Sequence, residues 1–367
     1  MKILILSCST GEGHNSAARA ISSELKRRGI EHEIADPVLF KGPRAQHFVA
    51  SFYNNMIKKR PAAFGILYKA GTLYDSTGIL SPVYLANATY AENLNQYILK
   101  YQFTAVISTH LYGMEAMTAV RNRCQNKIPS YGVLTDYTII PFFSEPKLDG
   151  YFIPHNDIRQ KLTKRGIDSN LIHATGIPVD IKFTHRVPKE DARRALKIPT
   201  DKIILAVMSG GIGGGNILDY CDELSNAFDT EAQIYVLTGK NTELCEIIRQ
   251  RYESSLITAV PFTTDVNLYM NAADILLTKP GGLSSTEAAV ANVPIIHINA
   301  IPGCETENVR FFTKHHMAYY AKNAKESVLC AKQLIDNPSQ MERMRAAQQA
   351  VIPQNAAEEI VRRVIEC

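Results

Sequence analysis

Short apolar runs alternate with longer amphipathic stretches along the whole chain. In the first half, strands are expected at 2–7, 31–36, 104–110, 129–136 and 150–154, and helices at 15–29, from about 112 and after 154. In the second half, strands are expected at 202–211, 232–239, 255–262, 273–282, 293–299 and 317–321, and the chain is helical from 324 onward. Apolar runs that alternate with helical patterns are typical of βαβ units and parallel sheets. The pattern predicts an α/β fold with two Rossmann-like halves.

The length of 367 residues suits two domains of this kind. A stretch with Gly and Pro at 174–180 ends the first half, so the expected domains are 1–178 and 179–345, followed by a helical segment at 346–367. Ligands of such folds bind at the carboxyl ends of the strands.

Charge and cysteine content exclude several classes of protein. The formal net charge is only +4, which does not indicate a nucleic-acid partner. Seven scattered cysteines without a CxxC pair indicate neither a disulfide framework nor a zinc site, and we expect a reducing, cytoplasmic location. We find no apolar run of about 18 residues that would span a membrane.

The stretch "STGEGHNS" at 9–16 places a glycine turn and a histidine between a strand and a helix. It is not a P-loop, because His14 stands where that motif requires lysine, and it lacks the third glycine of the dinucleotide fingerprint. The positive end of a helix disfavours an imidazolium, so His14 is a candidate proton acceptor. Alternatively, it is a helix-entry residue without chemistry. Asp136, after the strand at 129–136, either faces His14 or forms a turn.

The stretch "SGGIGGGN" at 209–216 again follows a strand and precedes a helix. Its glycines would let the backbone close on a diphosphate, although a flexible turn is the alternative. The loop contains no lysine and no obvious carboxylate for Mg²⁺, so N–H groups and the helix dipole would meet the phosphate charge.

Acidic residues follow two successive strands near 278–312. Gly281 and Gly282 break the first strand, and a helix capped by Ser284 or Ser285 would place Glu287 in its first turn. A carboxylate there can bind the diol of a ribose, and Glu305 and Glu307 follow the next strand. Glu287 alone could instead be an ordinary charge at the start of a helix, but two acidic clusters after successive strands favour polyol binding.

Basic and aromatic residues are interleaved at 41–74. The basic residues are Lys41, Arg44, Lys58, Lys59, Arg60 and Lys69, and the aromatic ones are Phe48, Phe52, Tyr53, Phe64, Tyr68 and Tyr74. Such a pattern suits an anionic membrane surface. The alternatives are nucleic acid, for which no motif is present, and a solvated helix whose aromatic side chains pack on the sheet.

At these places the sequence resembles the lipid glycosyltransferases of the monogalactosyldiacylglycerol-synthase and processive diacylglycerol-glucosyltransferase type. These are distant relatives of the transferase that adds N-acetylglucosamine to the lipid-linked peptidoglycan precursor. The matching pieces are "STGEGHNSAARAI", "LTDY", "GIPV", "MSGGIGGGN", "VPFTTDVNLYMNAADILLTKPGGLSSTEA" and "IPGCETENVRFF".

The resemblance implies a GT-B fold, with two Rossmann-like domains facing across a cleft and a C-terminal helix that crosses back. It implies an inverting transfer of hexose from UDP-glucose or UDP-galactose to a lipid hydroxyl, most simply that of diacylglycerol, on an anionic membrane surface at the inner face of the cell membrane. His14 would be the base, and Asp136 would orient it or share that role. No metal or other cofactor is implied, because the glycine loop and helix dipole would replace it.

The same resemblance implies which residues bind the substrates. Those on the donor side are Gly13, Ser209, Gly210, Gly211, Gly213, Phe262, Thr263, Gly281, Gly282, Glu287, Cys304, Glu305 and Asn308. Those on the membrane and acceptor side are Phe48, Phe52, Lys58, Lys59, Arg60, Phe64 and Tyr68. Cys304 stands where the family commonly has glutamine. Rival hypotheses are a UDP-sugar 2-epimerase, a transferase with another acceptor and a UDP-sugar sensor without catalysis.

Overall fold

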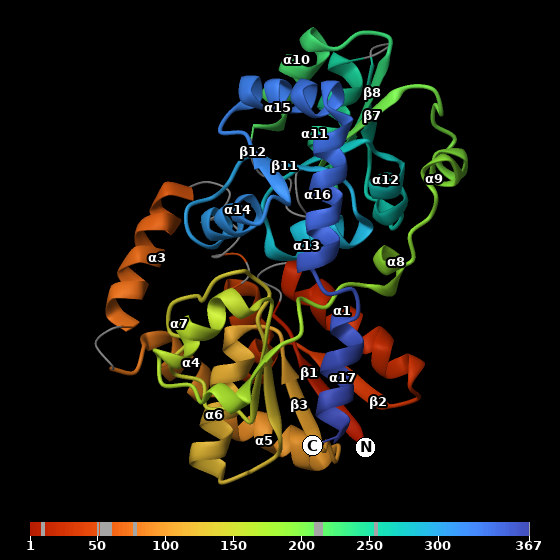
Figure 1. Cartoon of the computed structure of the whole chain (residues 1–367). Coiled ribbons are helices and arrows are strands. Elements are labelled where there is room, and N and C mark those ends of the chain that lie inside the picture. The colour runs from red at the N-terminus through yellow and green to blue at the C-terminus, as the bar shows by residue number, and fades with distance from the viewer. Residues whose placement is uncertain are drawn as a thin grey trace. The chain divides into compact units, whose positions relative to one another are not determined.

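The computed structural model describes residues 1–8, 12–49, 51, 61–75, 79–208, 216–252 and 256–366 (Figure 1). The chain forms two compact units. The first comprises Met1–Ile181, Pro302–Cys304 and Gln354–Cys367, and the second comprises Lys182–Ile301 and Glu305–Pro353.

The first unit is built on a six-stranded sheet in the order β2-β1-β3-β4-β5-β6, in which all neighbouring strands are parallel. Its strands are β1 (Lys2–Leu6), β2 (Glu31–Ala35), β3 (Ala105–Ser108), β4 (Ser130–Val133), β5 (Gly150–Ile153) and β6 (Ile172–Ala174). Its helices are α1 (Glu12–Arg27), η1 (Pro37–Lys41), α3 (Pro61–Asp75), α4 (Pro82–Ala88), α5 (Ala91–Lys100), α6 (Leu111–Cys124), η2 (Asn156–Ile158), α7 (Arg159–Thr163), η3 (Ser169–Leu171) and α17 (Ala356–Glu366).

Strand β1 is apolar at every position after Lys2 because helices cover both faces of its sheet. Ile3 and Ile5 are buried together with residues of α1 and α17, whereas Leu4 and Leu6 are buried with residues of α5 and α6. Figure 1 shows these helices beside the sheet. Successive side chains of a strand point to opposite faces, so burial on both sides requires a continuous apolar run.

The second unit repeats this architecture with the sheet order β12-β11-β10-β7-β8-β9, again with parallel neighbours. Its strands are β7 (Ile203–Met208), β8 (Ala232–Leu237), β9 (Ile257–Val260), β10 (Ile275–Thr278), β11 (Ile295–His297) and β12 (Ala318–Tyr320). After α8 (Ile181–Thr184), where the units change, its helices are α9 (Lys189–Leu196), α10 (Ile217–Ala227), α11 (Thr242–Arg251), α12 (Val266–Ala272), α13 (Gly282–Ala291), α14 (Cys304–Lys314), α15 (Ala324–Asp336) and α16 (Pro338–Val351).

The last helix belongs to the first unit. Ile360, Val361 and Val364 of α17 are buried together with Ile21 and Leu25 of α1. The chain therefore returns to its N-terminal unit, as expected for the GT-B class, and the α/β fold with two Rossmann-like units is confirmed. The helical segment expected at 346–367 contains the end of α16 and all of α17, and the change of unit falls at Pro353.

Two elements are not predicted by the apolar pattern. Strand β6 has the sequence "IHA", in which only Ile172 is strongly apolar, so it gives no apolar run. Helix α9 gives no apolar pattern either, because "KEDARRAL" is mostly charged and buries only Ala192 and Arg193. Within the described ranges, no helix is long and apolar enough to cross a membrane.

Arg193 is buried and fastens α9 to the second sheet. Its guanidinium contacts the Asp274 carboxylate at 2.8 Å. It also donates to the carbonyls of Ala272, Thr200 and Lys202 at 2.9–3.0 Å. Loss of one partner of such a pair leaves a buried charge without compensation.

We expect Arg193→Met to lower the free energy of unfolding by about 3 kcal/mol, because three carbonyls lose their donor and Asp274 keeps only Lys189 and the Ile204 N–H. The matched control is Arg194→Met, since Arg194 is exposed on the same helix and pairs only at the surface. That change should cost less than about 1 kcal/mol. Urea unfolding of both variants tests this, and equal losses would contradict it.

Candidate active site

Three polar residues of the first unit follow neighbouring strands. Helix α1 begins at Glu12 and not at Asn15, so His14 lies in its first turn, after β1. Thr109 directly follows β3, and Thr135 comes shortly after β4. Because β1, β3 and β4 are adjacent and parallel, all three residues lie at one edge of the sheet.

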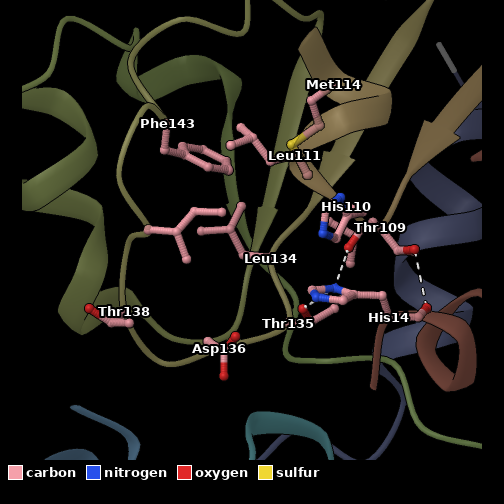
Figure 2. A pocket seen from close by; sticks show the side chains of 12 residues that line it. His14, Thr109, His110, Leu111, Met114, Leu134, Thr135, Asp136, Thr138 and Phe143 are labelled. Atoms are coloured by element: carbon pink, nitrogen blue, oxygen red, sulfur yellow. Dashed lines mark hydrogen bonds between the residues drawn. The ribbon is translucent and has the colours of Figure 1, made fainter. Parts of the chain in front are cut away.

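Hydrogen bonds determine which nitrogen of His14 carries the proton. Its Nδ1 lies 2.9 Å from the Thr109 carbonyl oxygen and 2.9 Å from the Thr135 hydroxyl oxygen (Figure 2). A carbonyl only accepts, so Nδ1 of the neutral ring carries the hydrogen and Nε2 carries the lone pair. Among the described residues, none forms a hydrogen bond with that Nε2.

The environment keeps this ring neutral. Burial lowers the pKa of His14 below the ordinary 6.5, although the Thr109 carbonyl acts in the opposite direction. The ring of His110 packs edge-on against it with centroids 4.6 Å apart, and burial lowers the pKa of His110 still further. A neutral imidazole with an available lone pair is the form that a general base requires. The expected neutral state of His14 therefore has burial as its main cause.

The His14 ring lines a small pocket of about 30 Å³, room for about one water or one hydroxyl group. One side of the pocket is polar and the other is apolar (Figure 2). Its lining residues are His14, Thr109, His110, Leu111, Met114, Val133, Leu134, Thr135, Asp136, Thr138, Ile140 and Phe143.

Asp136 lies at the rim of the same pocket but does not hold His14. Figure 2 shows its carboxylate directed away from the imidazole, whose Nδ1 is taken by Thr109 and Thr135. These two orienting residues were missed in the sequence. The available signal was their position, since each closely follows an apolar strand, and Thr135 directly precedes Asp136.

In the second unit, the corresponding edge lies between β7 and β10. These strands are neighbours, with Met208 opposite Thr278, and the connections leave them in opposite directions across the sheet. Such a switch point is where doubly wound sheets bind ligands. Ser209, Gly210, Gly211 and Gly213 follow β7 but lie outside the described residues.

Lys279 directly follows β10 at this switch point, a cation that the sequence reasoning missed. Its side chain is only 14% exposed, and its ammonium lies 3.5 Å from the Glu305 carboxylate. Glu305 lies in the first turn of α14 and also accepts the backbone N–H of Ile301 at 2.7 Å. Its carboxylate is thus held beside a lysine at the edge expected to bind the donor.

The predicted start of α13 is wrong. The helix begins at Gly282 with Gly281 as its N-cap, without a side-chain cap, so Glu287 lies beyond the first turn. Ser285 shares a hydrogen bond of 2.9 Å with His297 on β11 and does not cap the helix. Because Gly281 has no side chain to restrict its backbone, the first turn of α13 begins before Ser284, the first residue whose side chain suits an N-cap.

Asn308 is fully buried, and its amide donates to the Pro280 carbonyl at 2.9 Å. It therefore holds the loop that leads into α13.

The remaining residues predicted to bind the donor lie in or after different elements of the structure. Phe262 follows β9 with its ring exposed, and the Thr263 hydroxyl accepts the Asp265 N–H at 3.0 Å. Cys304 begins α14 and is half-buried, and Gly13 lies in the first turn of α1.

The predicted membrane residues are described only in part. Phe48 is exposed, and Tyr68 on α3 donates its hydroxyl proton to the Ile139 carbonyl at 3.3 Å. Phe64 falls within α3. Phe52, Lys58, Lys59 and Arg60 lie outside the described residues.

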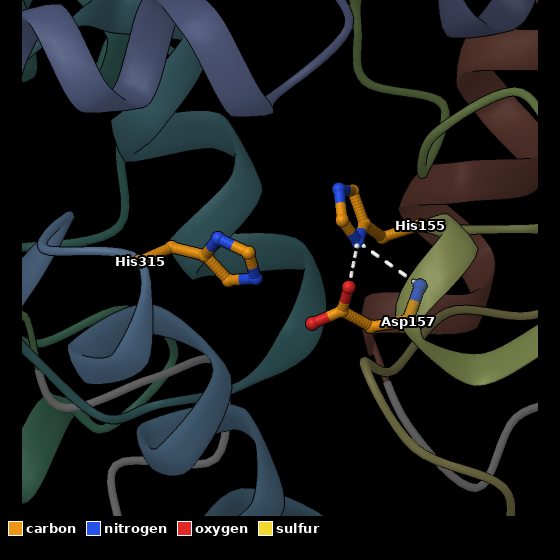
Figure 3. A group of neighbouring side chains, drawn as sticks. All are labelled: His155, Asp157 and His315. Atoms are coloured by element: carbon orange, nitrogen blue, oxygen red, sulfur yellow. Dashed lines mark hydrogen bonds and ion pairs between the residues drawn. The ribbon is translucent and has the colours of Figure 1, made fainter.

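Two further histidines have roles within their own units. His155 caps η2 by accepting the N–H of Asp157 at 3.2 Å (Figure 3). His315, in the second unit, packs its ring on Phe311 with centroids 4.6 Å apart. We assign neither to catalysis.

The fold and site define a glycosyltransferase of the GT-B class. Residues 182–365, half of the chain, match the family described as "Glycosyltransferase family 28 C-terminal domain", and the chain belongs to this family. Residues 14–179 match the family described as "Monogalactosyldiacylglycerol (MGDG) synthase". The resemblance inferred from the motifs is thereby confirmed.

Curated relatives align along nearly the whole chain. A processive diacylglycerol beta-glucosyltransferase of Bacillus pumilus is 24% identical over 370 residues, covering 100% of this chain and 94% of the relative. The protein of the same name from Staphylococcus aureus is 24% identical over 347 residues, covering 94% of this chain and 87% of the relative.

Solved structures agree with the fold. Acinetobacter baumannii MurG matches with a TM-score of 0.64 at 14% identity, covering 100% of this chain and 99% of that one. The UDP-GlcNAc 2-epimerase of Neisseria meningitidis, bound to UDP-GlcNAc, matches with a TM-score of 0.62 at 14% identity, covering 100% of both chains.

Burial of neutral histidines makes stability depend on pH. Burial lowers the pKa of His297 to about 3, so the unfolded chain takes up a proton below about pH 6.5 while the folded protein does not. Stability is therefore full above that pH and is lost as the pH falls toward the folded pKa. His14 and His110 act in the same direction.

We expect His297→Gln to reduce the loss of unfolding free energy between about pH 7 and about pH 5 by up to about 2 kcal/mol. Glutamine cannot take up this proton, although the variant is less stable at neutral pH. Urea unfolding at both pH values measures the difference. An unchanged pH dependence would show that His297 does not titrate in this way.

Proposed function

We propose that the protein transfers a hexose from UDP-glucose or UDP-galactose to the free hydroxyl of diacylglycerol, with inversion at the anomeric carbon. The observation that carries the proposal is the neutral His14 with its Nε2 lone pair at a pocket that takes one hydroxyl group. The names of the full-length relatives support the choice of acceptor.

In this reaction His14 Nε2 removes the proton of the acceptor hydroxyl as its oxygen attacks the anomeric carbon. The bond to the diphosphate breaks on the opposite face, and UDP leaves, so one displacement inverts the configuration. The proton on Nδ1 stays on the ring and is shared in hydrogen bonds with the Thr109 carbonyl and the Thr135 hydroxyl, whose oxygens stabilise the positive charge that forms. Asp136 at the rim adds a negative charge near the developing imidazolium.

The pocket volume suits a terminal hydroxymethyl group, because it has room for little more than one hydroxyl. Leu111, Met114 and Phe143 give it an apolar wall beside the polar His14 side. An acceptor with a primary hydroxyl at the end of an apolar body matches this division.

Lys279 and the uncapped start of α13 support the site of the donor. A diphosphate beside Gly281 would meet backbone N–H groups of the helix and the ammonium of Lys279. A Cβ built on Gly281 meets no atom within 4 Å, so there is space for a ligand there. In this proposal the protein's own groups neutralise the diphosphate, and no metal is required.

Exposed apolar side chains on α3 and beside α4 support docking on a membrane. Ile66 and Leu73 are 71% and 74% exposed and lie two helical turns apart, hence on one face of α3. Ile79, Leu80 and Leu85 are also exposed. Together with the basic residues of 41–60, they suit an anionic bilayer at which diacylglycerol is presented.

We expect His14→Ala to lower lipid-dependent UDP release by about 10²–10⁴-fold, because no other group replaces the base. The assay compares UDP-glucose with UDP-galactose, with and without diacylglycerol in anionic vesicles. The faster donor identifies the sugar.

The matched control is His32→Ala. His32 lies near the amino end of β2, away from the carboxyl edge of the sheet, and should leave the rate unchanged. Donor turnover without any lipid would instead support a 2-epimerase. Donor binding without turnover in the native protein would support a sensor.

We expect the double change Ile66→Asp and Leu73→Asp to reduce sedimentation with anionic vesicles by more than about tenfold, since each apolar side chain loses its transfer into lipid. Leu329→Asp is the control, because Leu329 is 66% exposed on α15 of the second unit. Equal binding by both variants would contradict docking through α3.

A further inference from the structure

A buried carboxyl group lies behind the pocket wall. Glu115 on α6 is fully buried, one residue after the pocket residue Met114. Its Oε2 accepts a hydrogen bond from the Asn87 amide on α4, and Asn87 Oδ1 accepts one from the Tyr90 hydroxyl at 2.6 Å. Its Oε1 is also buried but has no donor among the described residues. An ionised carboxylate in this place would lack compensation for one oxygen.

The group beside Glu115 is a second carboxyl, that of Glu145. Glu145 lies on the segment between β4 and β5 and accepts hydrogen bonds from the N–H and the hydroxyl of Ser81, the latter at 2.8 Å. Ser81 in turn caps α4 by accepting the Tyr84 N–H. Ionised carboxylates only accept hydrogen bonds, so Glu115 can bond to Glu145 only through a carboxylic acid proton. One proton therefore serves both groups.

In the part of the chain that the structure describes, no cation acts on the Glu115 carboxyl to favour its ionised form. Among the described groups, those that act on its carboxyl are Asn87 and Glu145, and burial raises its pKa well above the ordinary 4.5. The other described ionisable groups that interact with Glu115 are the hydroxyls of Tyr90 and Tyr112, which burial keeps neutral. Cations near the segment are engaged elsewhere: Arg165 with Asp75, Arg121 with Asp149, and Lys147 with the Ser144 carbonyl.

The segment that Glu145 anchors also forms much of the pocket. Residues 134–143 supply Leu134, Thr135, Asp136, Thr138, Ile140 and Phe143 to its lining. The N–H of Glu145 donates to the Phe142 carbonyl at 3.1 Å, so the carboxyl and the end of this wall move together. A change at Glu145 is therefore transmitted directly to Phe143.

We propose that Glu115 is a positioning residue that donates its carboxylic acid proton to Glu145 and so holds the 134–145 segment in place as the acceptor-side wall of the His14 pocket. The part that concerns the acceptor rests on the proposed function, whereas the shared proton does not. When the proton leaves to solvent, the buried Glu115 carboxylate faces the half-buried carboxylate of Glu145, and their repulsion releases the segment.

The test compares Glu115→Gln and Glu115→Met with the native protein. Glutamine keeps a donor for Glu145 and an acceptor for Asn87 but cannot ionise, and methionine keeps the shape only. Above about pH 4.5 the folded native protein holds a proton that the unfolded chain has released, so native stability falls as the pH rises. The Gln variant should lack this fall.

Melting temperatures between about pH 5 and about pH 8 give the first measurement. We expect the native midpoint to decrease with pH relative to that of Glu115→Gln. The control Glu31→Gln, an exposed glutamate on β2, should follow the native curve. Parallel curves for native protein and Glu115→Gln would overturn the shared proton, whatever the substrate is.

Cleavage by trypsin after the exposed Lys147 gives the second measurement and needs no substrate. It should accelerate with pH, relative to cleavage after the exposed Lys100, in the native protein but not in Glu115→Gln. If cleavage of Glu115→Gln after Lys147 accelerated with pH as in the native protein, the proposed release of the segment would be overturned.

The third measurement is the acceptor KM with vesicles that support UDP release. Glu115→Met should raise KM by about tenfold with a smaller effect on kcat, and Glu115→Gln should restore it. An unchanged KM in Glu115→Met would overturn the positioning role. If Glu115→Met does not fold, the acceptor KM is measured against pH instead. It should rise with pH in the native protein but not in Glu115→Gln, and equal behaviour of the two would overturn the positioning role.

Discussion

The carboxyl ends of parallel strands all lie at one edge of the sheet, and this constraint determines where polar residues gather in both units. His14, Thr109 and Thr135 are separated by long stretches of sequence, yet each follows one of three adjacent strands and they meet within hydrogen-bonding distance. Helices occupy both faces of the sheet, so the edge is the place where polar side chains can gather without disturbing the core. In the second unit, the same constraint brings Lys279 and Glu305 together.

The partners of His14 are uncharged, and this choice has a chemical consequence. A carboxylate at Nδ1 would stabilise the imidazolium and raise the pKa of the ring. The Thr109 carbonyl and the Thr135 hydroxyl fix the same tautomer with a weaker effect, so burial prevails and the resting ring is neutral. Asp136 lies at the rim and does not form the orienting bond (Figure 2).

Buried polar groups support both sites from behind. Asn308 holds the Pro280 carbonyl at the entrance to α13, and Ser285 ties the same helix to His297. Glu115 and Glu145 do the corresponding work behind the His14 pocket. Such groups are costly unless their hydrogen bonds are made, so each also limits how far its loop can move.

The sequence by itself determined the two α/β units, most strands and the class of chemistry, because apolar runs buried on both faces and glycine turns are local signals. It also singled out His14 as a candidate base. It could not find Thr109, Thr135, Lys279 or Glu115, because their roles depend on neighbours that are distant in the chain. Nor could it place the start of α13, where Gly281 takes the cap position and Ser285 bonds to His297. Only the tertiary structure decided these, since strand order determines which loops share an edge, and burial determines which side chains must find a partner there.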